Sequence, residues 1–540
     1  MACGRSLVPC PVSKSSRSLA SIAGIVALAT LISKVFGLFR EQAIAAAFGV
    51  GPVVNAYAYA YVIPGFLLIL LGGINGPFHS ALVSVLAKRD RSEAAPIVEA
   101  VTTLVSAALL VVAVALVLFA GFFIDLLAPG LDDLTRRIAL EQLQIMAPLA
   151  VLAGLIGIGF GTLNAADQYW LPSVSPLFSS IAVLLSLGLL ALLLEGNLDT
   201  PAYARWGALA LAGGTLAGGI WQWLAQVVAQ GRAGLGRLRL SFAWGQAGVQ
   251  EVVKVMVPAT LSSGMLHINV YTDLFFASYI VGAAAAMRYA NFIALTPLGI
   301  VSNMILVPFL PVFSRLTAPE HWPELKERIR QGLVLTALTM LPLTAIFVAL
   351  AKPVVRLIYE RFAFQAEASQ LVAPVLAAYG LGMFFYLARD VLVRVFYALG
   401  DGNTPFQISV ANIFLNILLD YLLVNAFQTP GLVMATIGVN IVSLVILLAI
   451  LQRRLHGLPL LAWGGLLAGL SGCAAIAGLA AWGVSGAWER WLGSESFLLL
   501  CLQLGVASGV AIALFGGLAF LLRLPELDLL VERVRQKLGR

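Results

Sequence analysis

The chain contains 540 residues, of which 60% are apolar and only 11% are charged, against about 25% charged residues in ordinary soluble domains. A soluble protein cannot bury this much apolar surface, and the long continuous apolar runs differ from the ten-residue alternation of a transmembrane β-barrel. The composition excludes soluble enzymes, nucleic-acid-binding proteins, disordered chains and secreted disulfide scaffolds. It predicts an all-α polytopic membrane protein.

Apolar windows long enough to cross a bilayer predict about fourteen transmembrane helices. In chain order they begin near Ala20, Val53, Val98, Leu140, Pro172, Tyr203, Val252, Ala290, Leu333, Ala368, Thr404, Gly431, Ala462 and Phe497. The basic segment 1–17 has no cleavage site after it, so the first span is expected to be retained. Residues after Pro525 fit an amphipathic helix on the inner leaflet, although a solvated tail fits nearly as well.

Charge orients these spans. An even number of spans puts both termini on one side of the membrane, and the loops on that side then hold most of the 33 lysines and arginines. Because cytoplasmic loops are enriched in these residues, both termini are expected to be cytoplasmic.

Two pairs of landmarks suggest an internal repeat. Tyr59 to Pro64 resembles Tyr289 to Pro297, and Phe160 to Pro172 resembles Phe396 to Pro405. Chance agreement remains an alternative in a chain with 24 prolines. A six-span unit repeats in the same orientation, so we expect two lobes related by a pseudo-two-fold axis along the membrane normal. The predicted domains are a cytoplasmic tail (1–18), an N-lobe (19–240), a C-lobe (241–455), two extra helices (456–523) and a cytoplasmic tail (524–540).

Charged and polar residues inside predicted spans mark candidate functional positions, because a charge in mid-membrane is costly. Candidate substrate-binding residues in the first, second, seventh and eighth spans are Lys34, Arg40, Asn55, Asp273 and Arg288. In a cavity between the lobes, basic side chains would bind an anionic substrate.

A second group of polar residues lies in the tenth and eleventh spans, namely Arg389, Asp390, Arg394 and Asp420. We expect a structural role for these residues, with Arg389 and Asp390 as an ion pair and Arg394 extending to the inner surface. Helix bending is assigned to Gly37, Pro64 and Pro297.

Motifs for catalysis are absent from the sequence: there is no Gly-x-Ser-x-Gly, no phosphate-binding loop and no His-Glu-x-x-His. We therefore expect no enzymatic activity, no cofactor and no metal site. Transport would be driven by the membrane potential or an ion gradient, and no nucleic-acid partner is expected.

The sequence SKVFGLFRE at 33–41, Asn55-Ala56-Tyr57 and Ile63-Pro64 resembles the opening of the MurJ (MviN-type) lipid II flippases. These belong to the multidrug/oligosaccharidyl-lipid/polysaccharide exporter superfamily. Further similarities at 76–81 and 394–405, and at Asn416 with Asp420, extend the resemblance from about residue 18 to 450.

The resemblance implies two six-helix lobes, with the two extra helices forming a groove for the polyprenyl tail. It implies alternating access that moves a lipid-linked peptidoglycan precursor from the inner to the outer leaflet of the bacterial cytoplasmic membrane. Lys34 and Arg40 would then bind the diphosphate, Arg288 would assist, and Asn55 and Asp273 would be polar lining. Membrane lipids and cell-wall synthesis proteins are the expected partners.

The chain departs from the family pattern in several places. Lys34 replaces the usual arginine, Asn55 replaces an acid, residues 67–70 are apolar where a basic pair is usual, and the family's basic residue of the eighth span falls at Phe292. Arg288 lies one helical turn earlier. These departures keep open a flippase for another polyprenyl-diphosphate-linked glycan, of O-antigen or exopolysaccharide type. A multidrug antiporter fits a basic cavity less well, and a membrane-embedded transferase would need clustered acids or histidines.

Overall fold

The computed structural model describes residues 19–72, 76–86, 88–196, 200–236, 238–265, 268–494 and 496–522. Over these ranges the chain forms α-helices with two short 3₁₀ turns and no β-strand, which confirms the all-α prediction. The two predicted cytoplasmic tails, 1–18 and 524–540, lie outside the described residues, and so does the proposed amphipathic tail helix.

The helices of the first half are α1 (Leu19–Phe48), α2 (Pro52–Gly72), α3 (Pro77–Leu86), α4 (Arg91–Leu118), α5 (Ala120–Leu127), α6 (Asp133–Met146), α7 (Leu149–Ala165), α8 (Trp170–Val174), α9 (Pro176–Leu193) and α10 (Ala204–Arg232). Those of the second half are α11 (Ala247–Met265), α12 (Ile268–Ala277), α13 (Ala283–Arg315), α14 (Trp322–Ala349), α15 (Ala351–Tyr359), α16 (Ala366–Ala398), α17 (Asn403–Arg454), α18 (Leu460–Trp491) and α19 (Phe497–Leu521). Each predicted span begins inside one of these helices or within two residues of its start.

Within the described ranges, nine helices are long and apolar enough to cross a membrane, or ten if the bent pair α6 and α7 is one span. This pair meets at an angle of 41°, where Pro148 cannot donate a helical hydrogen bond. The predicted eleventh and twelfth spans are both inside α17, which kinks at Gln428 (φ 51°, ψ −133°) just before Pro430. The non-helical backbone at Gln428 separates two helical segments of α17, which correspond to the predicted eleventh and twelfth spans and are counted together as one of the nine.

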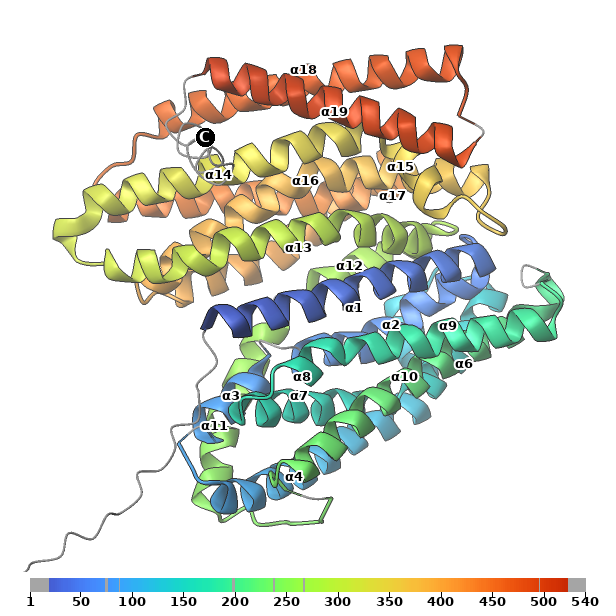
Figure 1. Ribbon diagram of the computed structural model, residues 1–540, viewed down its shortest axis with the longest axis vertical. Coiled ribbons are helices and arrows are strands. Elements are labelled where there is room, and N and C mark those ends of the chain that lie inside the picture. Colours follow the sequence, from blue (N-terminus) through green and yellow to red (C-terminus); the bar gives the residue numbers. More distant parts are fainter. Residues whose placement is uncertain are drawn as a thin grey trace, which may run out of the picture.

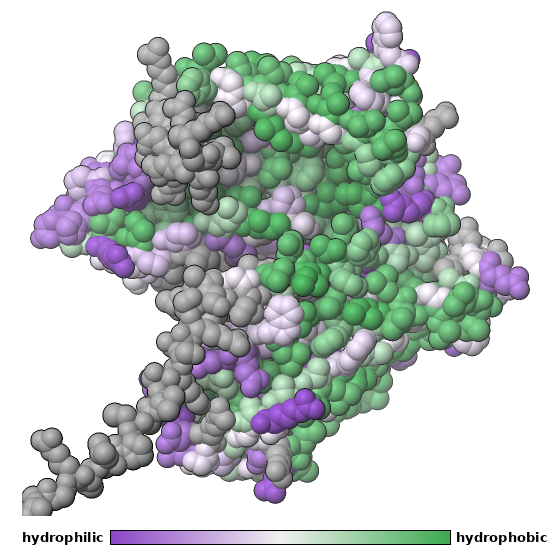
Figure 2. Space-filling view, in the orientation of Figure 1, coloured by the Kyte–Doolittle hydropathy of each residue, from purple (hydrophilic) through white to green (hydrophobic). Residues whose placement is uncertain are grey.

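The helices form two bodies, one above the other in Figure 1, with α1 and α12 between them. The lower body holds α2 to α11 and the upper body holds α13 to α19. Helix α1 packs on α8 and α9 below and reaches α15 above, while α18 and α19 form an outer pair that packs on α14. Most of the face shown in Figure 2 is hydrophobic, with hydrophilic residues gathered toward the ends of the helices, as expected for helices surrounded by lipid.

The chain crosses between the bodies in the middle of the predicted seventh span. Helix α11 packs on α3 and α4 of the first half, whereas α12 packs mainly on α17 of the second. Val249 and Val252 of α11 are buried in the same apolar cluster as Ile97 and Val101 of α4. The prediction that the C-lobe begins at 241 differs from this packing, because the apolar face of α11 is complementary to the first half.

Candidate functional site

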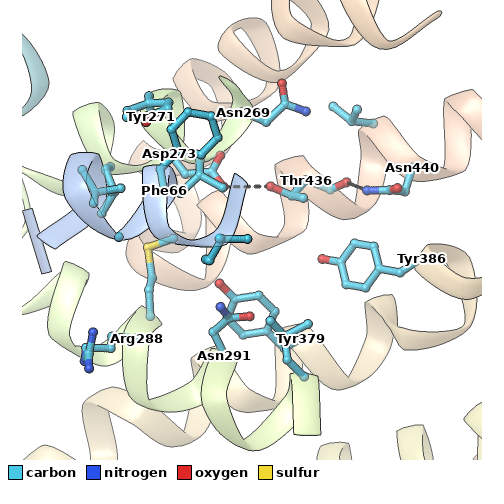
Figure 3. A pocket seen from close by; sticks show the side chains of 18 of the residues that line it. Phe66, Asn269, Tyr271, Asp273, Arg288, Asn291, Tyr379, Tyr386, Thr436 and Asn440 are labelled. Carbon is cyan, nitrogen blue, oxygen red and sulfur yellow. Dashed lines mark hydrogen bonds between the residues drawn. The ribbon is translucent and has the colours of Figure 1, made fainter. Parts of the chain in front are cut away.

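A cavity of about 660 Å³ lies between the two bodies. Its walls come from α2 in the first half and from α12, α13, α16 and α17 in the second. Figure 3 shows Arg288 and Asn291 of α13 on one side, with Tyr386 of α16 and Asn440 of α17 across from Arg288. A cavity of this size is within the range of about 300–1,000 Å³ that is typical of small-molecule sites.

Arg288 is the centre of a buried charged cluster beside this cavity. Its Nη2 donates a hydrogen bond to Glu41 Oε1 at 2.8 Å, and Nη2 of Arg40 donates to the same oxygen at 2.8 Å. Glu41 is only 1% exposed. Since two guanidinium groups share one carboxylate, the cluster keeps one positive charge, and the shared carboxylate ties α1 to α13.

Two tyrosines of α2 complete the surroundings of Arg288. The Cζ atom of Arg288 lies 4.9 Å from the ring centre of Tyr57 and 6.0 Å from that of Tyr61. The faces of these rings attract the cation and shield it from lipid. The sequence analysis did not identify these tyrosines, although their spacing of four residues places them on one face of a helix.

The structure separates the other predicted basic residues from the cavity wall. Lys34 is exposed on α1, and the described residues that line the cavity include neither Lys34 nor Arg40. Gly37, between them, faces Phe292: a Cβ atom at Gly37 would lie 3.8 Å from the Phe292 ring. Phe292, at the position where the resemblance implied a basic residue, therefore makes an apolar contact between α13 and α1.

Asn55 and the predicted hinge prolines are not among the described residues that line the cavity. The Oδ1 atom of Asn55 accepts a hydrogen bond from the backbone N–H of Ala285 at 3.3 Å, which joins the start of α2 to the start of α13. Pro64 and Pro297 lie inside α2 and α13. Their neighbours Gly65 and Leu298 line the cavity, so both prolines are next to residues of its wall.

Asp273 belongs to a second polar cluster, between α12 and α17. Asn416 donates from Nδ2 to Asp273 Oδ1 at 2.8 Å and to Asp420 Oδ2 at 2.7 Å. Thr436 donates to Asp273 Oδ2 at 3.0 Å. The remaining oxygens Asn416 Oδ1 and Asp420 Oδ1 are buried without a partner. Carboxylate, amide and hydroxyl oxygens form the kind of set that binds a hard cation or a proton. The sequence analysis did not identify Thr436, because no pattern links it to a residue so far away in the chain.

Arg389 and Asp390 line the far wall of the cavity. Their closest nitrogen–oxygen distance is 3.7 Å, so the predicted ion pair is present but its charged groups do not share a direct hydrogen bond. Instead, Nη2 of Arg389 donates to Ser409 Oγ at 3.2 Å. Arg394 is half-buried five residues further along α16 and is not among the described lining residues.

Comparison with known proteins identifies the family. The family model described as "Lipid II flippase MurJ" matches residues 44–502. A probable lipid II flippase MurJ of Synechocystis sp. is 66% identical over 98% of this chain and 99% of its own length. The chain belongs to the MurJ family. A lipid II flippase MurJ of Burkholderia cenocepacia is 29% identical over 86% of this chain and 89% of its own length.

Solved structures support the MurJ fold. A structure described as "Lipid II flippase MurJ, inward closed conformation" matches with a TM-score of 0.72 and 20% identity, over 91% of this chain and 97% of the other. An inward-facing multidrug transporter of the MATE family matches with a TM-score of 0.62 and 14% identity, over 80% of this chain and 98% of the other. These similarities show a shared fold. Together with the apolar helices, MurJ family membership identifies a multi-pass inner-membrane protein.

Proposed function

We propose that this protein moves lipid II, the lipid-linked peptidoglycan precursor, from the inner to the outer leaflet of the cytoplasmic membrane. The observation that carries the proposal is the buried Arg40–Glu41–Arg288 cluster at a cavity between the two bodies. Its surplus positive charge matches the diphosphate of such a lipid. The MurJ relatives, which are named lipid II flippases, support the same substrate.

The proposed mechanism is alternating access around this cavity. The diphosphate displaces Glu41 from Arg288 and binds this arginine itself. Glu41 then pairs with Arg40 alone, and the link between α1 and α13 is weakened. Lys34, exposed on α1, is the first cation that an approaching headgroup meets. The polyprenyl tail stays in the bilayer, against the outer pair α18 and α19. In this proposal both termini are cytoplasmic and cell-wall synthesis proteins are partners.

This proposal is tested by complementation of a flippase-depleted cell and by a flipping assay in vesicles. We expect the wild-type protein to restore wall growth, and Arg288→Gln to reduce flipping at least tenfold, because it removes a charge-assisted bond to the substrate. Arg205→Gln is the matched control, since Arg205 pairs with Glu141 on the protein surface. Failure of the wild-type protein to flip lipid II would refute the proposal.

We also propose that transport is coupled to a cation or proton gradient through Asp273 and Asp420. Two buried carboxylates joined by Asn416 repel each other unless a cation or a proton lies between them. Vesicle flipping should therefore speed up under an imposed gradient of one cation, and Asp420→Asn should abolish that dependence. Asp125→Asn, at an exposed carboxylate, is the control. A wild-type rate that ignores every cation and pH gradient would exclude coupling.

A second candidate substrate is another polyprenyl-diphosphate-linked glycan. It is favoured by Leu67, Leu68 and Phe292, which stand at positions where the family has basic residues. Competition in the vesicle assay separates the two candidates: lipid II should be displaced poorly by an O-antigen-type lipid if lipid II is the substrate.

A further inference from the structure

The far wall of the cavity is polar although it lies among membrane-spanning helices. Arg389 and Asp390 of α16 and Ser409, Asn412 and Asn440 of α17 all line it. Figure 3 shows Asn440 across the cavity from Arg288. Polar side chains at such positions are costly unless they contact water or a ligand. The proposed diphosphate site at Arg288 does not account for this wall.

Arg389 has hydrogen-bonding capacity that the protein does not use. A guanidinium group has five N–H donors, and among the described residues Arg389 donates only to Ser409. Its Nε is buried without a partner, and its side chain remains 21% exposed. The carboxylate of Asp390 is 49% exposed and is 3.7 Å from the guanidinium. A purely structural ion pair would be in direct contact, so both charges are left available to a ligand.

The two asparagines of the wall are held with their oxygens unpaired. Asn412 donates from Nδ2 to Ser443 Oγ at 2.7 Å, and Asn440 donates from Nδ2 to the carbonyl of Thr436 at 2.7 Å. No described residue donates to Oδ1 of either one. Their amide groups are thus fixed in place, and each keeps an acceptor for a ligand N–H or O–H group.

This wall combines a cation, an anion and two amide acceptors. A diphosphate fits it poorly, because phosphate oxygens only accept hydrogen bonds and Asp390 repels them. A neutral saccharide could bond to these groups through its hydroxyls, but it would neutralise neither charge. A peptide fits the whole set: its carboxylate pairs with Arg389, its ammonium pairs with Asp390, and its N–H groups donate to Asn412 and Asn440.

We propose that the wall formed by Arg389, Asp390, Ser409, Asn412 and Asn440 binds the peptide portion of the substrate headgroup, while Arg288 holds the diphosphate. This inference rests on the proposed function, since lipid II is a lipid diphosphate that carries both sugars and a peptide. It gives the cavity two subsites, one on each side.

The test measures binding of two lipids to the full-length protein in nanodiscs: lipid II, and the same lipid diphosphate and disaccharide without the peptide. Arg389→Gln should weaken lipid II binding about tenfold and change binding of the peptide-free lipid less than twofold. Arg389→Lys, which keeps the charge, should recover part of the loss. Arg205→Gln, at a surface pair outside the wall, should leave both affinities unchanged, and Arg288→Gln should weaken both.

The outcomes separate this inference from the proposed function. If Arg389→Gln weakens both lipids equally, or weakens neither, the peptide subsite is refuted while lipid II binding by the wild-type protein stands. If the wild-type protein binds the two lipids equally well, the subsite is also refuted. If the wild-type protein binds neither lipid, the proposed function fails and this inference fails with it.

Discussion

Glu41 is the residue on which the charged cluster depends. It bonds to both Arg40 and Arg288 and is almost completely buried. The sequence placed Arg40 and Glu41 side by side, but it could not show that Arg288, 247 residues away, would share the same carboxylate. For the same reason, the sequence analysis predicted Lys34 and Arg40 at the cavity wall. Helix periodicity shows which residues share one face of a helix, but it does not show which other helix that face contacts.

The variant Glu41→Gln tests this cluster. It leaves two partly buried cations without an anion, and loss of one partner from a buried ion pair costs about 3–5 kcal/mol. We expect a clearly lower midpoint of thermal unfolding in detergent. Glu251→Gln is the control, because Glu251 is exposed where it pairs with Arg89 and water screens this pair. Equal midpoints for the two variants would contradict a structural role for Glu41.

At the scale of elements, the apolar windows predicted where helices begin, because lipid imposes both length and composition on a span. They did not predict that the seventh span would pack on both halves of the molecule, with α11 on α3 and α4 and α12 mainly on α17. This arrangement depends on packing partners from elsewhere in the chain. The polar wall of the cavity was predicted only as scattered residues, since its members come from two helices that the sequence does not pair.

Close helix packing gives an element-scale prediction at Gly157. This glycine of α7 lies against the end of α2, and a Cβ atom there would overlap the backbone carbonyl of Leu71. Backbone cannot move aside as a flexible side chain can, so Gly157→Ala should destabilise the protein by about 1–3 kcal/mol. Gly188→Ala on α9, where a Cβ meets open space, should be neutral or slightly stabilising. Urea or thermal unfolding of both variants measures the stability that depends on this close contact between α2 and α7.

At the scale of the whole molecule, many of the contacts between the two bodies gather at one end. The backbone N–H of Ala363 donates to Ala46 O at 3.0 Å, and Gln42 donates to Ile358 O at 3.0 Å. Tyr289 also donates to Gly49 O at 2.9 Å. In Figure 1 this end, where α1 approaches α15, is on the right.

Alternating access requires this end to open. Cysteines introduced together by Ala46→Cys and Ala363→Cys, and joined by a short bis-maleimide, should hold it shut and stop flipping in vesicles. Either cysteine alone, treated with the same reagent, serves as the control and should leave the flipping rate unchanged. A cross-linked protein that still flips lipid at the normal rate would show that transport does not require separation at this end.

The shared carboxylate of Glu41 also has an electrical consequence. Because one anion serves two guanidinium groups, the empty carrier has a net positive charge at this point, and a bound diphosphate cancels or reverses it. The conformational change of the carrier then moves a different net charge when the lipid diphosphate is bound than when it is absent. In the proposed transport cycle, membrane voltage would therefore act unequally on the loaded and the empty carrier, and the resting potential of the cell would favour one direction before any ion gradient contributes.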